Sequence, residues 1–142
     1  MFFSVCFFVV RPHGFPARLR LKQRREFLRV QRGGRKHQLR HFIVFAAPCV
    51  PARESSSEPS PTRLGITVTR KVGNAVQRNR IKRMVREVFR QNRERLPSGI
   101  DLVFVAKQGA AEADFAGVLA DFEALLRRGQ LVGGERRERR DR

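Results

Sequence analysis

The sequence predicts one α/β domain, in which a layer of helices packs on a small β-sheet. Segments with helical and strand periodicity follow one another in the order helix, strand, strand, helix, strand, helix, and this order implies helices that cover a sheet. The 142 residues fit a single core, because domains cluster near about 100 to 150 residues. No internal repeat indicates a solenoid instead.

The first helix and the first strand are expected early in the chain. Residues 17–32, ARLRLKQRREFLRVQR, carry a thin apolar face among many basic residues and are followed by Gly33 and Gly34, which stop a helix. Residues 41–47, HFIVFAA, form a β-branched and aromatic run that ends at Pro48. Such a run is typical of a buried strand.

A polar segment separates this strand from the next one. Residues 51–62, PARESSSEPSPT, combine Pro, Ser and Glu with almost no apolar side chain, so we expect a flexible loop. In residues 63–69, RLGITVT, the apolar Leu64, Ile66 and Val68 alternate with smaller or polar residues. This alternation predicts a strand with one buried face.

The strongest helical pattern covers residues 74–95. Asn74 is a suitable N-cap, Gly73 provides the turn before it, and Pro97 follows the end of the helix. One face of this helix is expected to pack on the sheet. Its apolar residues recur at positions i, i+3, i+4, i+7 and i+8, namely Ile81, Met84, Val85, Val88 and Phe89.

A third strand and a last helix complete the predicted domain. Residues 101–106, DLVFVA, form another hydrophobic run. Asp114 can cap the helix that follows it. The apolar stripe of that helix is expected to consist of Phe115, Leu119, Phe122, Leu125 and Leu126.

Both ends of the chain are expected to lie outside the folded domain, which then covers residues 17–128. Residues 1–16 begin with an apolar run that lacks the basic region of a signal peptide and is shorter than the roughly 20 residues of a spanning helix. They are interpreted as a flexible extension. Residues 129–142 are almost devoid of apolar side chains after Val132 and are expected to be a disordered basic tail with non-specific attraction to RNA.

The cysteines indicate a reducing compartment. Cys6 and Cys49 belong to no Cys-x-x-Cys pair and have no histidine at metal-ligand spacing. The simplest interpretation is that both are small apolar residues of a cytoplasmic protein.

The charge of the chain predicts a polyanionic partner. The sequence has 31 Lys and Arg against 13 Asp and Glu, a net charge of +18 and a pI of about 11.8. Nucleic acid is the favoured partner. An anionic membrane also attracts basic segments, by about 1 kcal/mol per residue, but the sequence shows no lipidation motif, and no membrane partner is expected.

Ten of the basic residues lie between residues 70 and 95, where only Glu87 and Glu94 oppose them. A charged run is usually a solvated helix face. Here, however, nearly all charges have one sign, and like charges destabilise an isolated helix unless a polyanion neutralises them. We therefore expect a phosphate-binding stripe on the side away from the apolar face, formed by Lys82, Arg86, Arg90 and Arg93.

The segment from Lys71 to Arg90, KVGNAVQRNRIKRMVREVFR, resembles the signature of the bacterial ribonuclease P protein component. RLGITVTRK before it, LPSGIDLVFVAK after it, and REF and RHFIVF upstream extend the resemblance over about residues 17–128. The resemblance implies a two-layer α+β sandwich with a small mixed sheet and a left-handed βαβ crossover that contains the signature helix. It also implies a subunit of a ribonucleoprotein enzyme, an endoribonuclease that removes the 5′ leader of precursor tRNA.

The resemblance further implies which residues bind RNA. The residues expected to contact the catalytic RNA are Lys71, Arg78, Asn79, Arg80, Lys82, Arg83, Arg86 and Arg90. A cleft between the first helix and the sheet would hold the single-stranded leader at Phe27, Arg40 and Phe45. Aromatic rings suit a leader of variable sequence, because they stack on any base for about 1–3 kcal/mol. Where the family often has a second aromatic residue, this chain has Gln31, so its leader affinity is expected to be weaker.

Core packing is an equally good interpretation of Phe27 and Phe45, because buried surfaces are the commoner place for phenylalanine. Phe42 would exchange roles with Phe45 if the strand contained a bulge. From the residues alone, these alternatives stay open.

No catalytic or metal-binding constellation is recognisable in the protein. His13, His37 and His41 have no partner carboxylate at a recognisable spacing, and no Gly-Lys-Ser/Thr loop or carboxylate cluster is present. The resemblance accordingly implies that the RNA subunit positions Mg²⁺ and carries out catalysis. The implied partners are this catalytic RNA and precursor tRNA, with no cofactor on the protein itself and no protein partner.

Three other functions are weighed against this one. A ribosomal-type structural RNA-binding protein would share the charge and fold type, but the signature from Lys71 to Arg90 argues against it. A DNA-binding module is disfavoured because the 74–95 helix carries few Asn or Gln to read base edges. A protein-only nuclease would need the acidic site that the sequence lacks.

Overall fold

The computed structural model describes residues 16–49, 61–129 and 131. Within them, a four-stranded mixed sheet has the order β1-β2-β4-β3. The strands are β1 (Arg35–Gln38), β2 (Phe42–Pro48), β3 (Arg63–Thr67) and β4 (Ile100–Ala106). β1 and β4 pair antiparallel with β2, whereas β3 pairs parallel with β4. The predicted mixed α/β architecture is confirmed.

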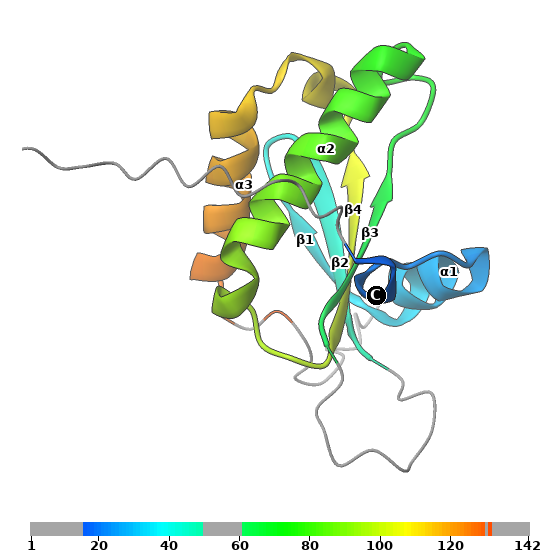
Figure 1. Cartoon of the computed structure of the whole chain (residues 1–142), viewed down its shortest axis with the longest axis vertical. Coiled ribbons are helices and arrows are strands. Elements are labelled where there is room, and N and C mark those ends of the chain that lie inside the picture. The colour runs from blue at the N-terminus through cyan, green and yellow to red at the C-terminus, as the bar shows by residue number, and fades with distance from the viewer. Residues whose placement is uncertain (1–15, 50–60, 130, 132–142) are drawn as a thin grey trace, which may run out of the picture.

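Two helices, α2 (Ala75–Asn92) and α3 (Phe115–Arg127), cover one face of this sheet (Figure 1). In this view β3 and β4 both run upward, α2 lies in front of them, and β4 is to the left of β3. The β3–α2–β4 crossover is therefore left-handed, opposite to the usual hand of such connections. The main core lies between this face and the two helices, and its largest fully buried side chains are Phe42, Phe89, Phe104, Phe122, Leu19, Ile81, Leu102 and Leu125.

The third helix, α1 (Arg24–Gly33), packs on the opposite face of the sheet. A smaller cluster lies beneath it, formed by the buried Leu21, Val30, Ala47 and Val103 together with the partly buried Phe27, Phe45 and Val105. Side chains of β2 and β4 alternate between the two faces. Phe42 of β2 therefore lies on the face under α2 and α3, and Phe45 lies on the face under α1.

The first helix was predicted to begin too early. Ala17–Leu19 form a 3-10 turn, Arg20 pairs with Leu64 at the edge of β3, and the helix begins only at Arg24. The Leu21 N–H donates to the Leu64 carbonyl at 3.0 Å. A long-range backbone hydrogen bond thus replaces the first turns of the expected helix.

Strand β1 was not predicted, because its sequence, RKHQ, contains no aliphatic residue. It pairs with β2 at the edge of the sheet, and its one buried side chain is His37. Cross-strand hydrogen bonds and this single buried ring make it a strand.

Element ends differ slightly from the expectations. β3 ends at Thr67 rather than at residue 69, and α2 ends at Asn92, followed by a 3-10 turn over Arg93–Arg95. In α3, Phe115 is 38 % exposed and Val118 is buried instead, so the predicted apolar stripe was wrong at its first position.

Some expectations lie wholly or mostly outside the described residues, namely the N-terminal extension (1–16), the loop (51–62), the tail (129–142) and Cys6. Cys49 is half-buried, and burial raises the pKa of its thiol. No described helix combines the length and the apolar character needed to cross a bilayer.

Candidate nucleic-acid interface

The basic helix α2 has a well-defined start. The Asn74 side chain accepts a hydrogen bond from the Gln77 N–H at 2.9 Å, and the Gln77 side chain accepts one from the Asn74 N–H at 3.0 Å. This reciprocal capping box satisfies two backbone donors. At Gly73, a Cβ atom would lie only 2.1 Å from Gln77 Oε1. A side chain there would therefore push the Gln77 side chain out of the cap. Gly73 has no positive φ, so the structure gives this glycine a different role from the expected turn, namely room for the capping side chain.

The two sides of α2 separate core from charge, as the periodicity predicted. Ile81, Val85, Val88 and Phe89 are buried, and Met84 packs partly against them. Of the residues expected to bind the catalytic RNA, five are exposed and three are half-buried. The exposed ones are Lys71, Asn79, Arg80, Arg83 and Arg90, and the half-buried ones are Arg78, Lys82 and Arg86.

Arg90 differs from the other basic residues because it has an acidic partner on the same helix. Its Nε donates to Glu87 Oε2 at 3.0 Å, and this interaction raises the pKa of the Arg90 guanidinium. The same pair lowers the pKa of Glu87. RNA would have to compete with Glu87 for Arg90, whereas no ion pair engages Arg83 or Lys82 within the described part of the chain.

Arg86 lies close to a cation that the sequence analysis did not select. Burial lowers the pKa of the Arg86 guanidinium, and the nearby charge of Arg20 lowers it further. Arg20 belongs to the segment that runs along β3. The only signal for it in the sequence is the alternation of leucine and arginine in RLRL, which is too short to identify a site.

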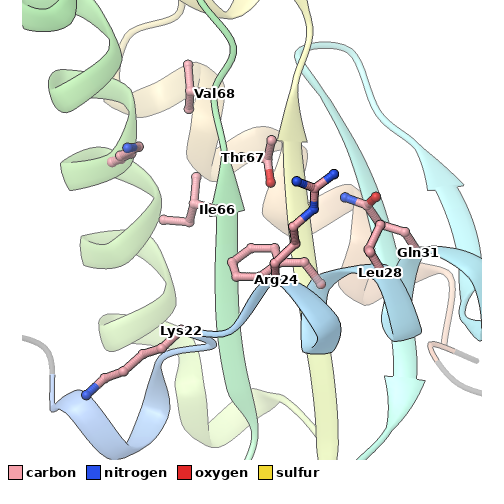
Figure 2. A pocket seen from close by; sticks show the side chains of 9 residues that line it. Lys22, Arg24, Leu28, Gln31, Ile66, Thr67 and Val68 are labelled. Carbon is pink, nitrogen blue, oxygen red and sulfur yellow. The ribbon is translucent and has the colours of Figure 1, made fainter.

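A groove of about 460 Å³ lies between α1, β3 and α2 (Figure 2). In Figure 2, Arg24, Leu28 and Gln31 reach it from α1, while Ile66, Thr67 and Val68 belong to the β3 side. The remaining lining residues are Lys22, Phe27 and Lys82. The groove thus combines apolar and aromatic surface with cations at its edges, a combination that suits single-stranded nucleic acid.

Phe27 lines this groove because β3 has a glycine beneath it. A Cβ atom at Gly65 would lie 2.6 Å from Phe27 Cε1, so any larger residue would displace the ring. Phe27 is half-buried, with one part packed on the cluster under α1 and another part facing the groove. The core-packing interpretation is therefore partly correct, and contact of this ring with a leader stays a prediction.

The other two residues expected in the leader cleft lie apart from Phe27. Phe45 is half-buried on the α1 face and packs against the same cluster, but it does not line the groove. Arg40 is exposed in the turn between β1 and β2 and does not line it either. The expected exchange of Phe42 with Phe45 does not occur, because β2 pairs without a bulge and Phe42 is fully buried against Phe104 on the other face.

An ionic network that the sequence analysis missed attaches α1 to the sheet. Asp101, in β4, is fully buried and accepts hydrogen bonds from Arg29 of α1 and from Arg63 of β3. Arg63 donates Nε to Asp101 Oδ1 at 2.9 Å and Nη2 to Oδ2 at 2.8 Å, and its Nη1 reaches Glu26 Oε1 at 2.9 Å. The hydrogen bonds to Asp101 raise the pKa of Arg63. The network fixes the position of α1, which forms one wall of the groove.

No histidine has a carboxylate at a recognisable spacing in the sequence, but the structure gives His41 a partner that spacing could not reveal. Asp121, 80 residues later, accepts a hydrogen bond from the His41 N–H at 2.8 Å and lies 3.3 Å from its Nδ1. The pair joins the β1–β2 turn to α3 and does not line the groove. His37 is buried, with Nε2 3.1 Å from the Leu131 carbonyl oxygen, whereas His13 lies outside the described residues.

Within residues 16–49, 61–129 and 131, no group of three or more His, Cys, Asp or Glu side chains could hold a metal ion. The surface features near the groove are cationic, and cations attract phosphate and repel metal ions. What the arrangement can do chemically is therefore to bind and position a polyanion.

Comparison with known proteins agrees with this geometry. Residues 15–130 match the family model described as Ribonuclease P. A ribonuclease P protein component from Desulfovibrio desulfuricans is 43 % identical over 123 residues, covering 84 % of this chain and 88 % of the relative. The solved RNase P protein of Staphylococcus aureus superposes with a TM-score of 0.67 at 29 % identity, over 81 % of this chain and 98 % of that one. For the Thermotoga maritima RNase P protein the TM-score is 0.65 at 34 % identity, with 81 % and 98 % covered.

Proposed function

Because the chain belongs to the ribonuclease P protein family, we propose that it acts as the protein subunit of ribonuclease P and promotes removal of the 5′ leader from precursor tRNA. The observation that carries the proposal is the outer face of α2. Nearly all of its charges are positive, and they lie opposite an inner face whose buried residues are all apolar. Apart from Arg90, which Glu87 engages, the cations of this face repel one another, and binding of a polyanion relieves that repulsion.

In this proposal the catalytic RNA binds along α2, and its backbone phosphates meet Lys71, Arg78, Arg80, Lys82, Arg83 and Arg86, with Asn79 as a neutral hydrogen-bonding partner. Arginine suits this surface because its planar fork can donate two parallel hydrogen bonds to phosphate oxygens. Arg90 contributes less than the others, because Glu87 already engages it.

The groove beside α1 is proposed to hold the single-stranded leader of precursor tRNA. Phe27 offers a partly exposed ring for stacking, while Lys22 and Lys82 provide charge at the edges. Phe45 and Arg40 belong to the same proposal only as outer contacts, because neither lines the groove itself. The short polar Gln31 stands in the groove where a second ring would add affinity.

The chemical step is proposed to belong to the RNA subunit, which would position Mg²⁺ for hydrolysis of the leader phosphodiester. The protein supports this step by binding phosphates near the RNA and lowering the repulsion between leader and catalytic RNA. We further propose that the protein acts in the cytoplasm with these two RNAs and requires no protein partner.

The test is 5′ processing of a precursor tRNA at low Mg²⁺ by the cognate catalytic RNA, with and without this protein. We expect the protein to restore cleavage at the mature 5′ end. A protein that binds RNA but leaves cleavage unchanged would instead be a structural RNA-binding protein. Cleavage by the isolated protein, abolished by a point substitution in it, would overturn the assignment of catalysis to RNA.

The RNA-binding face has its own prediction. Replacing Arg83 by Ala should weaken binding of the catalytic RNA and reduce the slope of log affinity against log salt by about one unit, because one phosphate contact is lost. Titrations at several salt concentrations measure the slope, and Arg32→Ala, on the exposed last turn of α1, is the control of equal charge. An unchanged slope in Arg83→Ala would remove this side chain from the interface.

A further inference from the structure

A second pocket, of about 290 Å³, lies next to the groove. We call it the N-terminal pocket, and it is lined by Ala17, Arg18, Arg20, Lys22, Gln23, Glu26 and Arg63. Lys22 lines both the groove and this pocket. The two hollows are therefore neighbours on one surface, with Lys22 between them.

The basic residues of this pocket are held in place by the leucines between them. Leu19 and Leu21 are buried, and the Leu21 N–H is bonded to the carbonyl of Leu64 at 3.0 Å. Arg18 and Lys22 remain exposed on either side of these anchors. Because the backbone between them is paired to β3, the cations keep a defined spacing that a flexible tail would not have.

The single acid of the pocket lining, Glu26, is already engaged by other residues of the lining. Glu26 Oε1 accepts the Arg63 guanidinium at 2.9 Å, and its Oε2 accepts the backbone N–H groups of Lys22 and Gln23, both at 3.3 Å. Arg63 in turn is held by Asp101. This arrangement leaves the Arg18 guanidinium and the Lys22 ammonium without an acid from the pocket lining. Arg20 adds a further positive charge, which is close enough to Arg86 to lower the pKa of that residue.

We propose that the N-terminal pocket binds a backbone phosphate of the same unpaired RNA strand that occupies the groove, at the point where the strand passes Lys22. The proposal rests on the proposed function, since it extends the path of the leader. A phosphate fits better than a base, because the lining contains cations and no aromatic ring. The groove then holds bases, and the pocket holds the backbone beyond them.

The test uses the assembled protein and catalytic RNA with a series of precursor tRNAs whose leaders increase one nucleotide at a time. In the wild type, affinity should rise in a first step when the leader reaches the groove and in a second step when it reaches the pocket. Arg18→Ala should abolish only the second step, a loss of about three- to tenfold for long leaders, as for one charge-assisted phosphate contact. Arg18 lines the pocket but not the groove, and its exposed side chain can be removed without disturbing the core.

Two further variants separate this site from general charge. Arg18→Lys should retain the second step, and Arg32→Ala, which removes the same charge from a residue that lines neither hollow, should leave it unchanged. An equal loss at every leader length in Arg18→Ala would overturn the proposal and assign the residue to the catalytic RNA. An equal loss in Arg18→Ala and Arg32→Ala would overturn it as well, in favour of non-specific attraction.

Failure of the proposed function would look different. In that case the protein would not restore cleavage at low Mg²⁺, and neither Phe27→Ala nor Arg18→Ala would change the dependence on leader length. If Phe27→Ala removes the first step while Arg18→Ala changes nothing, the groove stands and the N-terminal pocket is refuted.

Discussion

The two faces of the sheet are built in different ways. The face under α2 and α3 is closed by aliphatic and aromatic side chains, with Phe104 between Phe42 and Phe122. The face under α1 has a small apolar cluster and a buried carboxylate held by two arginines. The first face supplies most of the buried apolar surface, which is the main source of stability, whereas the second leaves aromatic surface partly open.

This difference indicates that one face of the sheet mainly stabilises the fold and that the other positions a binding surface. A helix attached by ion pairs can be positioned accurately without covering the whole sheet face, because hydrogen-bonded charges define geometry with little area. The half-buried Phe27 and Phe45 remain accessible for that reason. The comparison therefore predicts that substitutions on the closed face act on folding alone, and that those on the open face act on RNA binding as well.

The largest expected effect lies on the closed face. Phe104→Ala should lower the free energy of unfolding by about 3–5 kcal/mol, because it removes a buried ring and leaves a cavity between Phe42 and Phe122. Denaturant titration measures the loss. Phe115→Ala is the control, since this ring is 38 % exposed and its removal should cost little. Equal losses in the two variants would contradict the assignment of the core.

Asp101→Asn should have the next largest effect. It should lower the free energy of unfolding by about 3 kcal/mol, because two guanidinium groups lose a buried charged partner. Unlike Phe104→Ala, it should also weaken binding of precursor tRNA relative to mature tRNA under conditions in which the variant is fully folded, because α1 forms a wall of the groove. Affinity for the catalytic RNA alone serves as the internal control. If discrimination between precursor and mature tRNA survives in folded Asp101→Asn, the network does not position the groove.

Phe27→Ala should separate binding from folding most clearly. We expect a loss of about 1–3 kcal/mol in leader-dependent affinity, as for one stacked base, with processing at saturating substrate less affected. The paired variant Gln31→Phe adds a ring to the same groove and should raise affinity for the leader. Equilibrium binding of tRNAs with and without a leader measures both. A Phe27→Ala protein with unchanged leader affinity would assign this ring to packing alone.

The smallest expected effect concerns pH. Burial lowers the pKa of His37 below its ordinary value of 6.5, so the unfolded chain takes up a proton at a higher pH than the folded chain does. Stability from the neutral ring is complete above that ordinary value, and it falls as the pH drops below it. Urea titrations at pH 7.5 and 5.5 on the wild type and His37→Gln measure the difference, and a wild type with the same pH slope as His37→Gln would refute this source of pH dependence.

Local patterns predicted α2 almost to the residue. Its N-cap, its buried face and its one-signed outer face all depend on residues within a few positions of one another, so the sequence alone was sufficient. The core strands β2 and β4 were predicted for the same reason, because short apolar runs of branched and aromatic residues are typical of buried strands. The family resemblance added the left-handed crossover, which periodicity cannot reveal.

The errors concern elements that depend on distant partners. Arg20 and Leu21 have a helical composition but pair with β3, and β1 has no apolar pattern but pairs with β2. The ionic network at Asp101 was missed, and the residue was treated only as the start of a strand. Nothing near it in the sequence shows that Arg29 and Arg63 contact it. His41 and Asp121, 80 residues apart, were missed for the same reason.

The sequence by itself determined the fold class, the basic helix, the polyanionic partner and the family, because charge, period and motif are properties of neighbouring residues. Only the tertiary structure decided that Phe27 lines a groove while Phe45 and Arg40 do not, and that Arg18, Arg20 and Lys22 surround a second hollow beside it. These placements depend on where α1 and the segment before it attach to the sheet. That attachment is made by a carboxylate in β4 and a carbonyl in β3, far along the chain from the residues that they position.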